Sequence, residues 1–250
     1  RAVVSGHPDI ATGDVIGSNI ANIILIMGAT AFLCPIRKIT QNQVNQAAIN
    51  VAIALGLIMM SFLMMQFNPV FGVVALILLT LIMVYQVKIG SLNFSDVEEK
   101  GEYSLFISGV LIVIGIMLLV YGSKFFVNGA VNIATAYGIP ESVIGVSLVA
   151  FGTSLPELVV GVLSAARKKV DFALGNVLGS NLYNVLGVLG VSSFFGRFEF
   201  PPHIANFDLY VMTGVIIFIT FYMVAMKKLG RLYGVLSLLV YTFYIGYMYI

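Results

Sequence analysis

Apolar residues fall into eight long stretches, and short polar segments separate them along the whole chain. Each stretch is long enough to cross the ~30 Å hydrocarbon core of a membrane as an α-helix. The segment 127–137 follows the fourth stretch without a charged residue, so we expect it to extend that helix or to lie at the membrane interface. The pattern predicts an all-α, polytopic membrane protein with spans at residues 14–33, 45–66, 69–87, 104–126, 140–166, 172–194, 208–226 and 232–250.

The basic residues predict how these helices are oriented, because lysine and arginine collect in cytoplasmic loops. One alternating set of loops holds ten of the thirteen basic residues. This set, which we expect on the cytoplasmic side, comprises Arg37, Lys38, Lys88, Lys100, Arg167, Lys168, Lys169, Lys227, Lys228 and Arg231. The other set comprises Arg1, Lys124 and Arg197. Arg1 and Ile250 are therefore predicted to be extracellular, in a multi-pass protein of the plasma membrane.

Composition supports a membrane protein and excludes other classes. Hydrophobic residues make up 60% of the 250 positions and charged residues only 10%, against about a quarter charged in soluble domains. No basic run is interleaved with aromatic residues, which argues against a nucleic-acid partner. His7 and His203 lie in loops without acidic or thiol partners, so we interpret them as surface residues. The lipid bilayer is the expected surrounding, and the sequence is compatible with a monomer without fixing the oligomeric state.

Two segments of the chain repeat one another. Residues 9–28 read DIATGDVIGSNIANIILIMG and residues 171–190 read DFALGNVLGSNLYNVLGVLG, with nine identities in twenty and no gap. In the orientation above, the first copy enters the membrane from outside and the second from inside. We therefore expect antiparallel, inverted repeats, which many secondary transporters use to build a site near the middle of the membrane.

The fifth span carries the strongest chemical signal. It contains GTSLPE at 152–157, which sets Glu157 in an otherwise apolar helix. A charged side chain there costs roughly 3 kcal/mol to insert, so it normally faces the protein interior and serves an ion or a pathway. Pro156 lacks an N–H group and disturbs the preceding turn, which can free backbone carbonyls to face a cavity as cation ligands. The carbonyls concerned are those near Ala150, Phe151 and Thr153.

Each repeated segment presents polar side chains on one helix face, because residues four apart align along a helix. Calcium takes about six to eight hard oxygen ligands, carboxylates among them. The polar faces supply such oxygens beside Glu157, although small polar residues also join membrane helices by packing and hydrogen bonds. The two stripes are Asp14, Ser18 and Asn22 in the first copy and Asn176, Ser180 and Asn184 in the second.

For several residues of the repeats, the sequence favours a structural role over ion binding. Asn19 and Asn181 lie off the stripes, and we interpret them as packing residues. Asp14 and Asn176 lie near helix starts, where they can act as caps or vestibule residues rather than ligands. We expect close helix contact at the glycines of the repeats, namely Gly17, Gly28, Gly179, Gly187 and Gly190.

At GTSLPE and at the paired segments GSNIAN, 17–22, and GSNLYN, 179–184, the chain resembles the cation/calcium antiporter superfamily, particularly prokaryotic sodium/calcium exchangers. The resemblance spans nearly the whole chain. It implies the family fold of ten helices in two inverted five-helix halves, with about eight helices present here. The first helix and part of the second would lie outside this sequence. Residues 1–100 would then be the remainder of the first inverted repeat, and residues 101–250 the second.

The resemblance also implies a set of oxygen ligands around one central carboxylate, that of Glu157, which calcium and sodium would share. The flanking ligands would be the side chains of Thr153, Ser180 and Ser18, the carbonyl of Ala150 at an outer sodium position, and the pair Asn22 and Asn184 beside the central site. A second acidic motif of the family would fall just before Arg1. Some members, such as potassium-dependent exchangers, have aspartate at the position of Asn184, so asparagine argues against potassium co-transport.

The expected function is secondary active antiport of calcium against sodium by alternating access. Calcium and sodium are the only ligands that we expect, with no cofactor and no catalytic residue, so the protein is not expected to be an enzyme. Three alternatives remain. A passive channel is disfavoured because the inverted repeat predicts a closed site with two faces, and flux stoichiometry would exclude it. A proton/calcium antiporter would use Glu157 as a titrating group. An intramembrane hydrolase would use Ser154 or Thr153 with Glu157, but no histidine or lysine lies at a suitable depth to act as its base.

Overall fold

The computed structural model describes residues 8–63, 65–91 and 104–248, and the regular structure in them is helical. Several long helices are divided into α-helical and π-helical (η) pieces. In chain order the elements are α1 (Pro8–Ala21), η1 (Asn22–Ile26), α2 (Met27–Leu33), α3 (Gln41–Phe62), α4 (Pro69–Ser91), α5 (Leu105–Ala136), α6 (Glu141–Ile144), η2 (Gly145–Val149), α7 (Ala150–Thr153), α8 (Leu155–Ala166), α9 (Val170–Leu182), η3 (Tyr183–Leu189), α10 (Gly190–Ser192), η4 (Ile204–Asp208), α11 (Leu209–Met226) and α12 (Arg231–Met248). The all-α prediction is confirmed.

Six helices of the described residues are long and apolar enough to cross a membrane, and a seventh span results if η2, α7 and the bent α8 are counted as one. The sequence predicts about eight. The difference is α12, at the position of the eighth expected stretch, whose Arg231 and four tyrosines lower its mean hydropathy. α5 continues to Ala136, so the segment after residue 126 extends the fourth span, and Lys124 lies inside a helix rather than in a loop.

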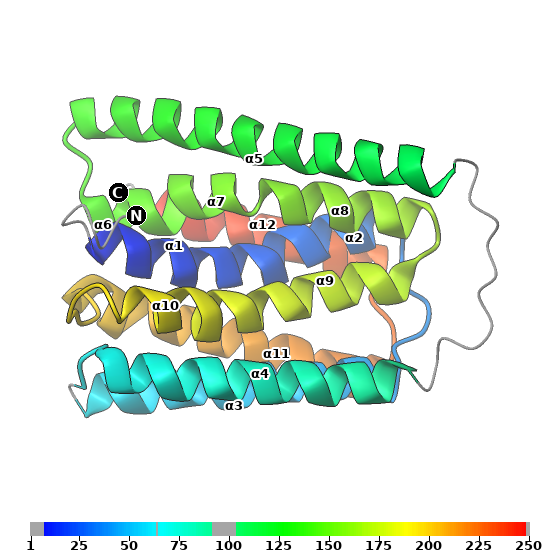
Figure 1. Cartoon of the computed structure of the whole chain (residues 1–250), viewed down its shortest axis with the longest axis horizontal. Coiled ribbons are helices and arrows are strands. Elements are labelled where there is room, and N and C mark those ends of the chain that lie inside the picture. The colour runs from blue at the N-terminus through cyan, green and yellow to red at the C-terminus, as the bar shows by residue number, and fades with distance from the viewer. Residues whose placement is uncertain (1–7, 64, 92–103, 249–250) are drawn as a thin grey trace.

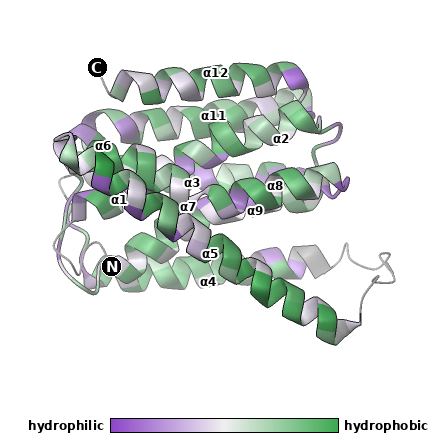
Figure 2. Ribbon diagram, turned by 90° about the horizontal axis from the view of Figure 1, so that it is seen from above, coloured by the Kyte–Doolittle hydropathy of each residue, from purple (hydrophilic) through white to green (hydrophobic). Residues whose placement is uncertain are grey.

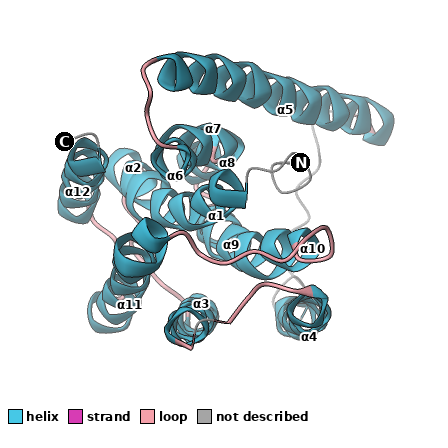
Figure 3. Ribbon diagram, turned by 90° about the vertical axis from the view of Figure 1, so that its left-hand side faces the viewer, coloured by secondary structure: helices cyan, strands magenta, loops and turns pink. Residues whose placement is uncertain are grey.

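The helices lie side by side in one elongated bundle (Figure 1). The continuous helix made by α1, η1 and α2 lies in the middle when the bundle is viewed end-on (Figure 3). Of the 18 residues in its most apolar stretch, 83% are buried. α5 diverges across one face and is hydrophobic along most of its length (Figure 2). None of the 18 residues in its most apolar stretch is buried by the described part of the chain, as suits a helix that faces lipid.

The connections fall at the two ends of the bundle. The connections from α2 to α3, from α8 to α9 and from α11 to α12 lie at one end, together with the C-terminal end of α4 (Figure 1). The connections from α3 to α4, from α5 to α6 and from α10 to η4 lie at the other end (Figure 1). This alternation fits the two sets of loops inferred from the basic residues. Arg1 and Lys100 of those sets lie outside the described residues.

The two repeated segments form antiparallel helices. α1 runs toward the end of the bundle at which α9 begins (Figure 1), and α1 contacts η3 while η1 contacts α9. Both helices change from α to π at nearly equivalent positions. η1 begins at Asn22, and η3 begins at Tyr183, one residue before Asn184, which is the equivalent of Asn22 in the second repeat. Single π-helical turns are rare in proteins, and those that occur often lie at functional sites. The division of the chain into halves at residue 100 stays a prediction.

Glycines bring the central helix against η2 and α7. A Cβ atom added at Gly17 would overlap the Val146 carbonyl oxygen and would lie 2.7 Å from Ala150 Cβ. A Cβ at Gly145, on the other side of the contact, would lie 2.9 Å from a backbone oxygen of α1. Only residues without a side chain permit this approach. The contact holds Ser18 next to the start of α7.

The other glycines of the repeats differ from one another. A Cβ at Gly28 would lie 2.9 Å from Ser237 Cβ, and a Cβ at Gly187 or Gly190 would also meet a neighbour at just over 3 Å. At Gly179 no atom of the described residues lies within 4 Å of the Cβ position. At Gly187 the near neighbour is Tyr183 of the same helix, so the expected close contact between helices is found at three of these five glycines, Gly17, Gly28 and Gly190, in the described part of the chain.

Candidate functional site

The fifth span breaks at the GTSLPE sequence. α7 ends at Thr153 and α8 begins at Leu155, with a bend of 48° between the two parts of the span. Pro156 lies in the first turn of α8, where its missing N–H group is not needed and its ring does not continue the preceding helix. The disturbance predicted at this proline is confirmed. It leaves Thr153 at the end of one helix and Glu157 in the first turn of the next.

Four oxygen atoms converge where α1 meets this bend, and we call them the oxygen cluster: Asp14 Oδ1, Ser18 Oγ, the Ala150 carbonyl oxygen and Thr153 Oγ1. Thr153 Oγ1 donates a hydrogen bond to Asp14 Oδ1 at 2.7 Å, and Ser18 Oγ donates to it at 3.3 Å. The two hydroxyl oxygens are 3.1 Å apart. The Ala150 carbonyl accepts a hydrogen bond from the Ser154 N–H at 3.1 Å and also lies 3.4 Å from Ser18 Oγ and 3.2 Å from Thr153 Oγ1. Each hydroxyl has one hydrogen, so it donates either to this carbonyl or to Asp14.

Glu157 lies beside this cluster. The Ser180 hydroxyl of α9 hydrogen-bonds its carboxylate, and Asp14 is close enough for the two charges to interact. Its Oε2 atom is buried and has no hydrogen-bond partner among the described residues. Its backbone carbonyl accepts a hydrogen bond from Asn176 Nδ2 at 3.4 Å. A buried anionic oxygen without a donor is costly, and it is available to bind a cation.

The residues of the site differ in burial within the described part of the chain. Thr153 is exposed, whereas Asp14, Glu157 and Ser180 are half-buried and Ser18 is buried. No group of three or more His, Cys, Asp or Glu side chains in the described residues is placed to hold a metal ion. A cation here would therefore be held by neutral oxygens together with the carboxylates of Asp14 and Glu157. Such a donor set suits hard ions.

Asn22 and Asn184, which the family resemblance pairs, have different surroundings. Asn22 is buried and donates from Nδ2 to Asn181 Oδ1 of α9 at 2.8 Å. Asn181 is fully buried, and Asn184 is half-buried within η3. Asn19 donates to the Val15 carbonyl of its own helix at 2.7 Å. Asn22 is thus hydrogen-bonded to Asn181, for which the sequence predicts a packing role, and not to Asn184.

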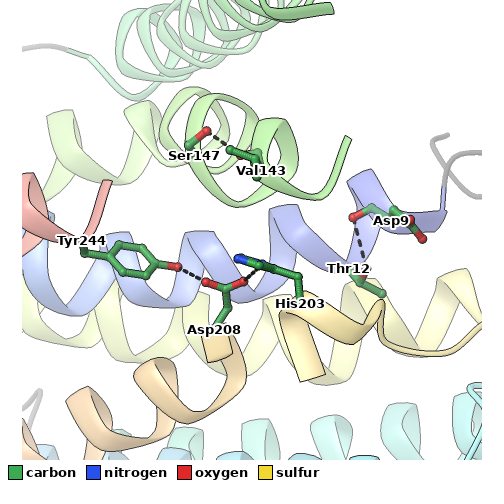
Figure 4. Close-up of polar contacts among 7 residues, drawn as sticks. All are labelled: Asp9, Thr12, Val143, Ser147, His203, Asp208 and Tyr244. Carbon is green, nitrogen blue, oxygen red and sulfur yellow. Dashed lines mark hydrogen bonds and ion pairs between the residues drawn. The ribbon is translucent and has the colours of Figure 1, made fainter. Parts of the chain in front are cut away.

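A second polar cluster consists of His203, Asp208 and Tyr244, at η4 and α12 (Figure 4). The Asp208 carboxylate is completely buried. Its Oδ1 accepts a hydrogen bond from the Tyr244 hydroxyl at 2.7 Å, and its Oδ2 lies 2.8 Å from His203 Nδ1. The His203 side chain is 41% exposed, so it does reach the surface, but the expectation that it lacks an acidic partner is wrong. The sequence signal for this cluster was the carboxylate at the start of the seventh apolar stretch.

Comparison with known proteins gives matches along most of the chain. The family model described as Sodium/calcium exchanger protein matches residues 1–88 and 107–250. An uncharacterized membrane protein of Methanocaldococcus jannaschii is 36% identical over 237 residues, which cover 94% of this chain and 75% of that protein. The sodium/calcium exchanger MaX1 of Methanosarcina acetivorans is 38% identical over 135 residues, which cover 52% of this chain and 37% of MaX1.

Solved structures of the sodium-calcium exchanger NCX_Mj have the same fold. One, soaked with 2.5 mM Na+ and 10 mM Sr2+, gives a TM-score of 0.78 at 33% identity over 98% of this chain and 79% of that chain. Another, soaked with 10 mM Na+ and zero Ca2+, gives a TM-score of 0.79 with the same coverage. The polytopic fold and the resemblance drawn from the GTSLPE and GSN motifs are confirmed. The chain belongs to the sodium/calcium exchanger family.

Proposed function

We propose that the protein is a secondary active antiporter that exchanges calcium for sodium across the plasma membrane by alternating access. The observation that carries the proposal is the surroundings of Glu157. Its carboxylate, hydrogen-bonded by Ser180, lies beside hydroxyl and carbonyl oxygens from α1 and α7. Ser18 and Ser180 come from antiparallel helices, α1 and α9 (Figure 1), the arrangement by which secondary transporters enclose an ion between two halves.

The relatives support calcium and sodium as the transported ions. MaX1 is named a sodium/calcium exchanger, and NCX_Mj, a sodium-calcium exchanger, was soaked with Na+ and with Sr2+. Because the chain belongs to a family of transporters, it is not an enzyme, and the hydrolase alternative is excluded.

Each predicted ligand has a role in this proposal. Glu157 is the central carboxylate, which calcium and sodium bind in turn. The neutral oxygen ligands are the side chains of Ser18, Thr153 and Ser180, the Ala150 carbonyl at an outer sodium position, and the amides of Asn22 and Asn184 beside the central site. Asn22 is held by Asn181, which supports a fixed orientation of its amide.

Competition for the same oxygens couples the two ions. A calcium ion compensates more negative charge than a sodium ion does, so several sodium ions are needed to replace one calcium ion. Occupancy by one kind of ion then excludes the other. The bend between α7 and α8 gives the site two short helices whose tilt can change, and π-helical turns in η1, η2 and η3 supply further points where the helices can adjust.

The experiment replaces Glu157 by glutamine in the full-length protein, reconstituted in lipid vesicles. Glutamine keeps the size and hydrogen bonds of the side chain but removes the charge that calcium requires. We expect Glu157→Gln to abolish radioactive calcium uptake driven by an outward sodium gradient. Glu199→Gln is the matched control, because Glu199 lies on the surface and bonds to Gln66; uptake by this variant should equal that of the wild type. Full uptake by Glu157→Gln would defeat the proposal.

The same vesicles separate sodium from proton coupling. A sodium gradient is imposed with equal, strongly buffered pH on both sides, and a pH gradient is imposed in parallel without sodium. Sodium exchange predicts calcium uptake in the first arm only. Uptake in the second arm only would replace the proposal by proton/calcium antiport.

A further inference from the structure

Asp14 sets a carboxylate into the central helix of the bundle. It lies in the second turn of α1, is half-buried, and contacts Thr153 at the end of α7. A charged side chain within a membrane-spanning helix is costly and normally faces a pathway or an ion. The negative charge of Asp14 therefore needs a compensating partner.

The described part of the chain offers Asp14 hydroxyl groups but no positive charge. Its carboxylate accepts hydrogen bonds from Thr153 and Ser18, and no lysine, arginine or histidine side chain of the described residues acts on it. The charge that does interact with Asp14 is that of Glu157, which is also negative. Two neutral donors do not compensate two neighbouring carboxylates in a buried site. A bound cation would compensate both.

The buried Oε2 atom of Glu157 points to a ligand independently. It has no hydrogen-bond partner among the described residues, whereas buried side-chain oxygens in folded proteins are nearly always paired. A cation between this oxygen and the oxygen cluster would pair it.

The spacing of the oxygen cluster also suits a hard cation. Oxygen ligands lie about 2.3–2.6 Å from calcium, so two ligands at right angles are about 3.3–3.7 Å apart. In the cluster, Thr153 Oγ1 and Asp14 Oδ1 are 2.7 Å apart, and Ser18 Oγ lies 3.3 Å from Asp14 and 3.4 Å from the Ala150 carbonyl. A small expansion, with the hydroxyl hydrogens turned outward, converts these hydrogen-bonded oxygens into the ligands of one ion.

The charge is present in one repeated segment only. The equivalent of Asp14 in the second segment is Asn176, whose neutral amide donates to the Glu157 carbonyl. Asp14 therefore adds a second carboxylate to a set of predicted ligands in which Glu157 alone is acidic. Because Coulomb energy scales with the product of the charges, this carboxylate strengthens the binding of a divalent cation more than that of a monovalent one.

We infer that Asp14 is a further cation ligand, added to the proposed ligands Ser18, Thr153 and the Ala150 carbonyl, and that its charge strengthens the binding of calcium more than that of sodium. This inference rests on the proposed exchange function and deepens it.

Asp14→Asn tests the inference in the full-length protein in lipid vesicles, because asparagine keeps the shape of the side chain and an acceptor for Thr153 and Ser18. Sodium-driven uptake of radioactive calcium is measured over ranges of calcium and sodium concentration. We expect the half-saturating calcium concentration to rise about tenfold or more and that of sodium to change less than about threefold, since the lost charge acts more strongly on the divalent ion. Equal changes for both ions, or no change, would overturn the inference.

Two further variants separate charge from packing. Asp14→Glu keeps the charge on a longer side chain and should keep the preference for calcium; loss of the preference to the same degree as in Asp14→Asn would count against the inference. Asp9→Asn is the matched control on the same helix. The contact that the structure gives Asp9 uses its backbone carbonyl, which accepts from Thr12, so this variant should behave as the wild type.

Calcium binding to the detergent-purified full-length protein, measured by calorimetry with calcium chloride alone, distinguishes failure of this inference from failure of the exchange proposal. Weaker binding by Asp14→Asn supports the ligand role even if the wild type shows no sodium-driven uptake, a result that would defeat the exchange proposal alone. Unchanged binding by Asp14→Asn, with Glu157→Gln inactive in transport, defeats the ligand role and leaves the exchange proposal standing.

Discussion

Asp208 is a carboxylate with no exposed surface. It lies where η4 joins a strongly apolar helix, α11. A buried charge is tolerated only when it is paired and hydrogen-bonded, and removal of one partner leaves its desolvation uncompensated. His203 Nδ1 lies 2.8 Å from one carboxylate oxygen, and the Tyr244 hydroxyl donates to the other at 2.7 Å. The stability of this end of the bundle should therefore depend on both side chains.

Tyr244→Phe removes one donor and leaves the rest of the ring in place. We expect it to lower the free energy of unfolding by about 1–3 kcal/mol, because a buried acceptor loses its hydrogen bond. Thermal unfolding of the detergent-purified protein measures the effect. Tyr247→Phe is the control, since Tyr247 is 55% exposed and contacts Phe207 through its ring. Equal losses in both variants would show that the Tyr244 hydroxyl is not what stabilises Asp208.

At the scale of single elements, the crossing of α1 with η2 and α7 controls the site. Gly17 is the point of closest approach, and the hydroxyl of the next residue, Ser18, lies 3.4 Å from the Ala150 carbonyl oxygen across the contact. Any side chain at position 17 must push the two helices apart. The geometry of the oxygen cluster then changes together with the packing.

Gly17→Ala adds one methyl group at this crossing. We expect a loss of about 1–3 kcal/mol in stability, the usual cost of overpacking, together with weaker calcium uptake, because Ser18 moves away from Ala150. Unfolding and transport assays of the same preparation check both effects. Gly214→Ala on α11 is the matched control, because a Cβ there meets nothing in the described residues, and it should leave both properties unchanged. Normal behaviour of Gly17→Ala would mean that the helices can separate without loss.

The π-helical turns explain which local contacts could not be predicted from the sequence. The stripes of polar residues assume four-residue spacing along an α-helix, and this spacing correctly brought Asp14 and Ser18 together. In a π-helix the backbone hydrogen bonds join residues five apart, which brings His203 and Asp208 closer to one face across η4. In an α-helix they would point in different directions. No simple residue pattern in the sequence marks where these turns begin.

The break at Pro156 could be predicted, because a missing N–H group and a fixed ring have the same consequence in any helix. The partner of Asn22 could not. Helical spacing specifies the face on which a residue lies, but the choice between Asn181 and Asn184 depends on how α1 and α9 cross. That crossing is determined by side chains from several elements at once.

For the whole molecule, length and hydropathy were sufficient to predict a polytopic all-α fold, since only continuous apolar helices satisfy their backbone groups within lipid. They could not show that α1 is central and that α5 diverges from the bundle. Both helices are strongly apolar, and lipid and neighbouring helices favour the same side chains. Burial within a membrane protein therefore leaves little trace in hydrophobic content alone.

The two ends of the bundle also differ in charge. Arg167 lies at the end that carries most of the basic residues of the described chain, and Arg197 lies in the connection at the opposite end. Positive charges are retained on the cytoplasmic side during insertion. The structure separates the two sets of loops, and the charge difference then assigns a side to each.

Labelling of single cysteines tests this assignment. The chain contains one cysteine, Cys34, so Cys34→Ser gives a background into which Arg197→Cys or Arg167→Cys is introduced; both arginines are exposed. In intact cells a membrane-impermeant maleimide should label Arg197→Cys and not Arg167→Cys, because only the first lies on the predicted extracellular side. Permeabilised cells should label both, which shows that each site is reactive. Labelling of Arg167→Cys alone in intact cells would mean that the protein is inserted in the opposite orientation, with the first turn of α1 facing the cytoplasm.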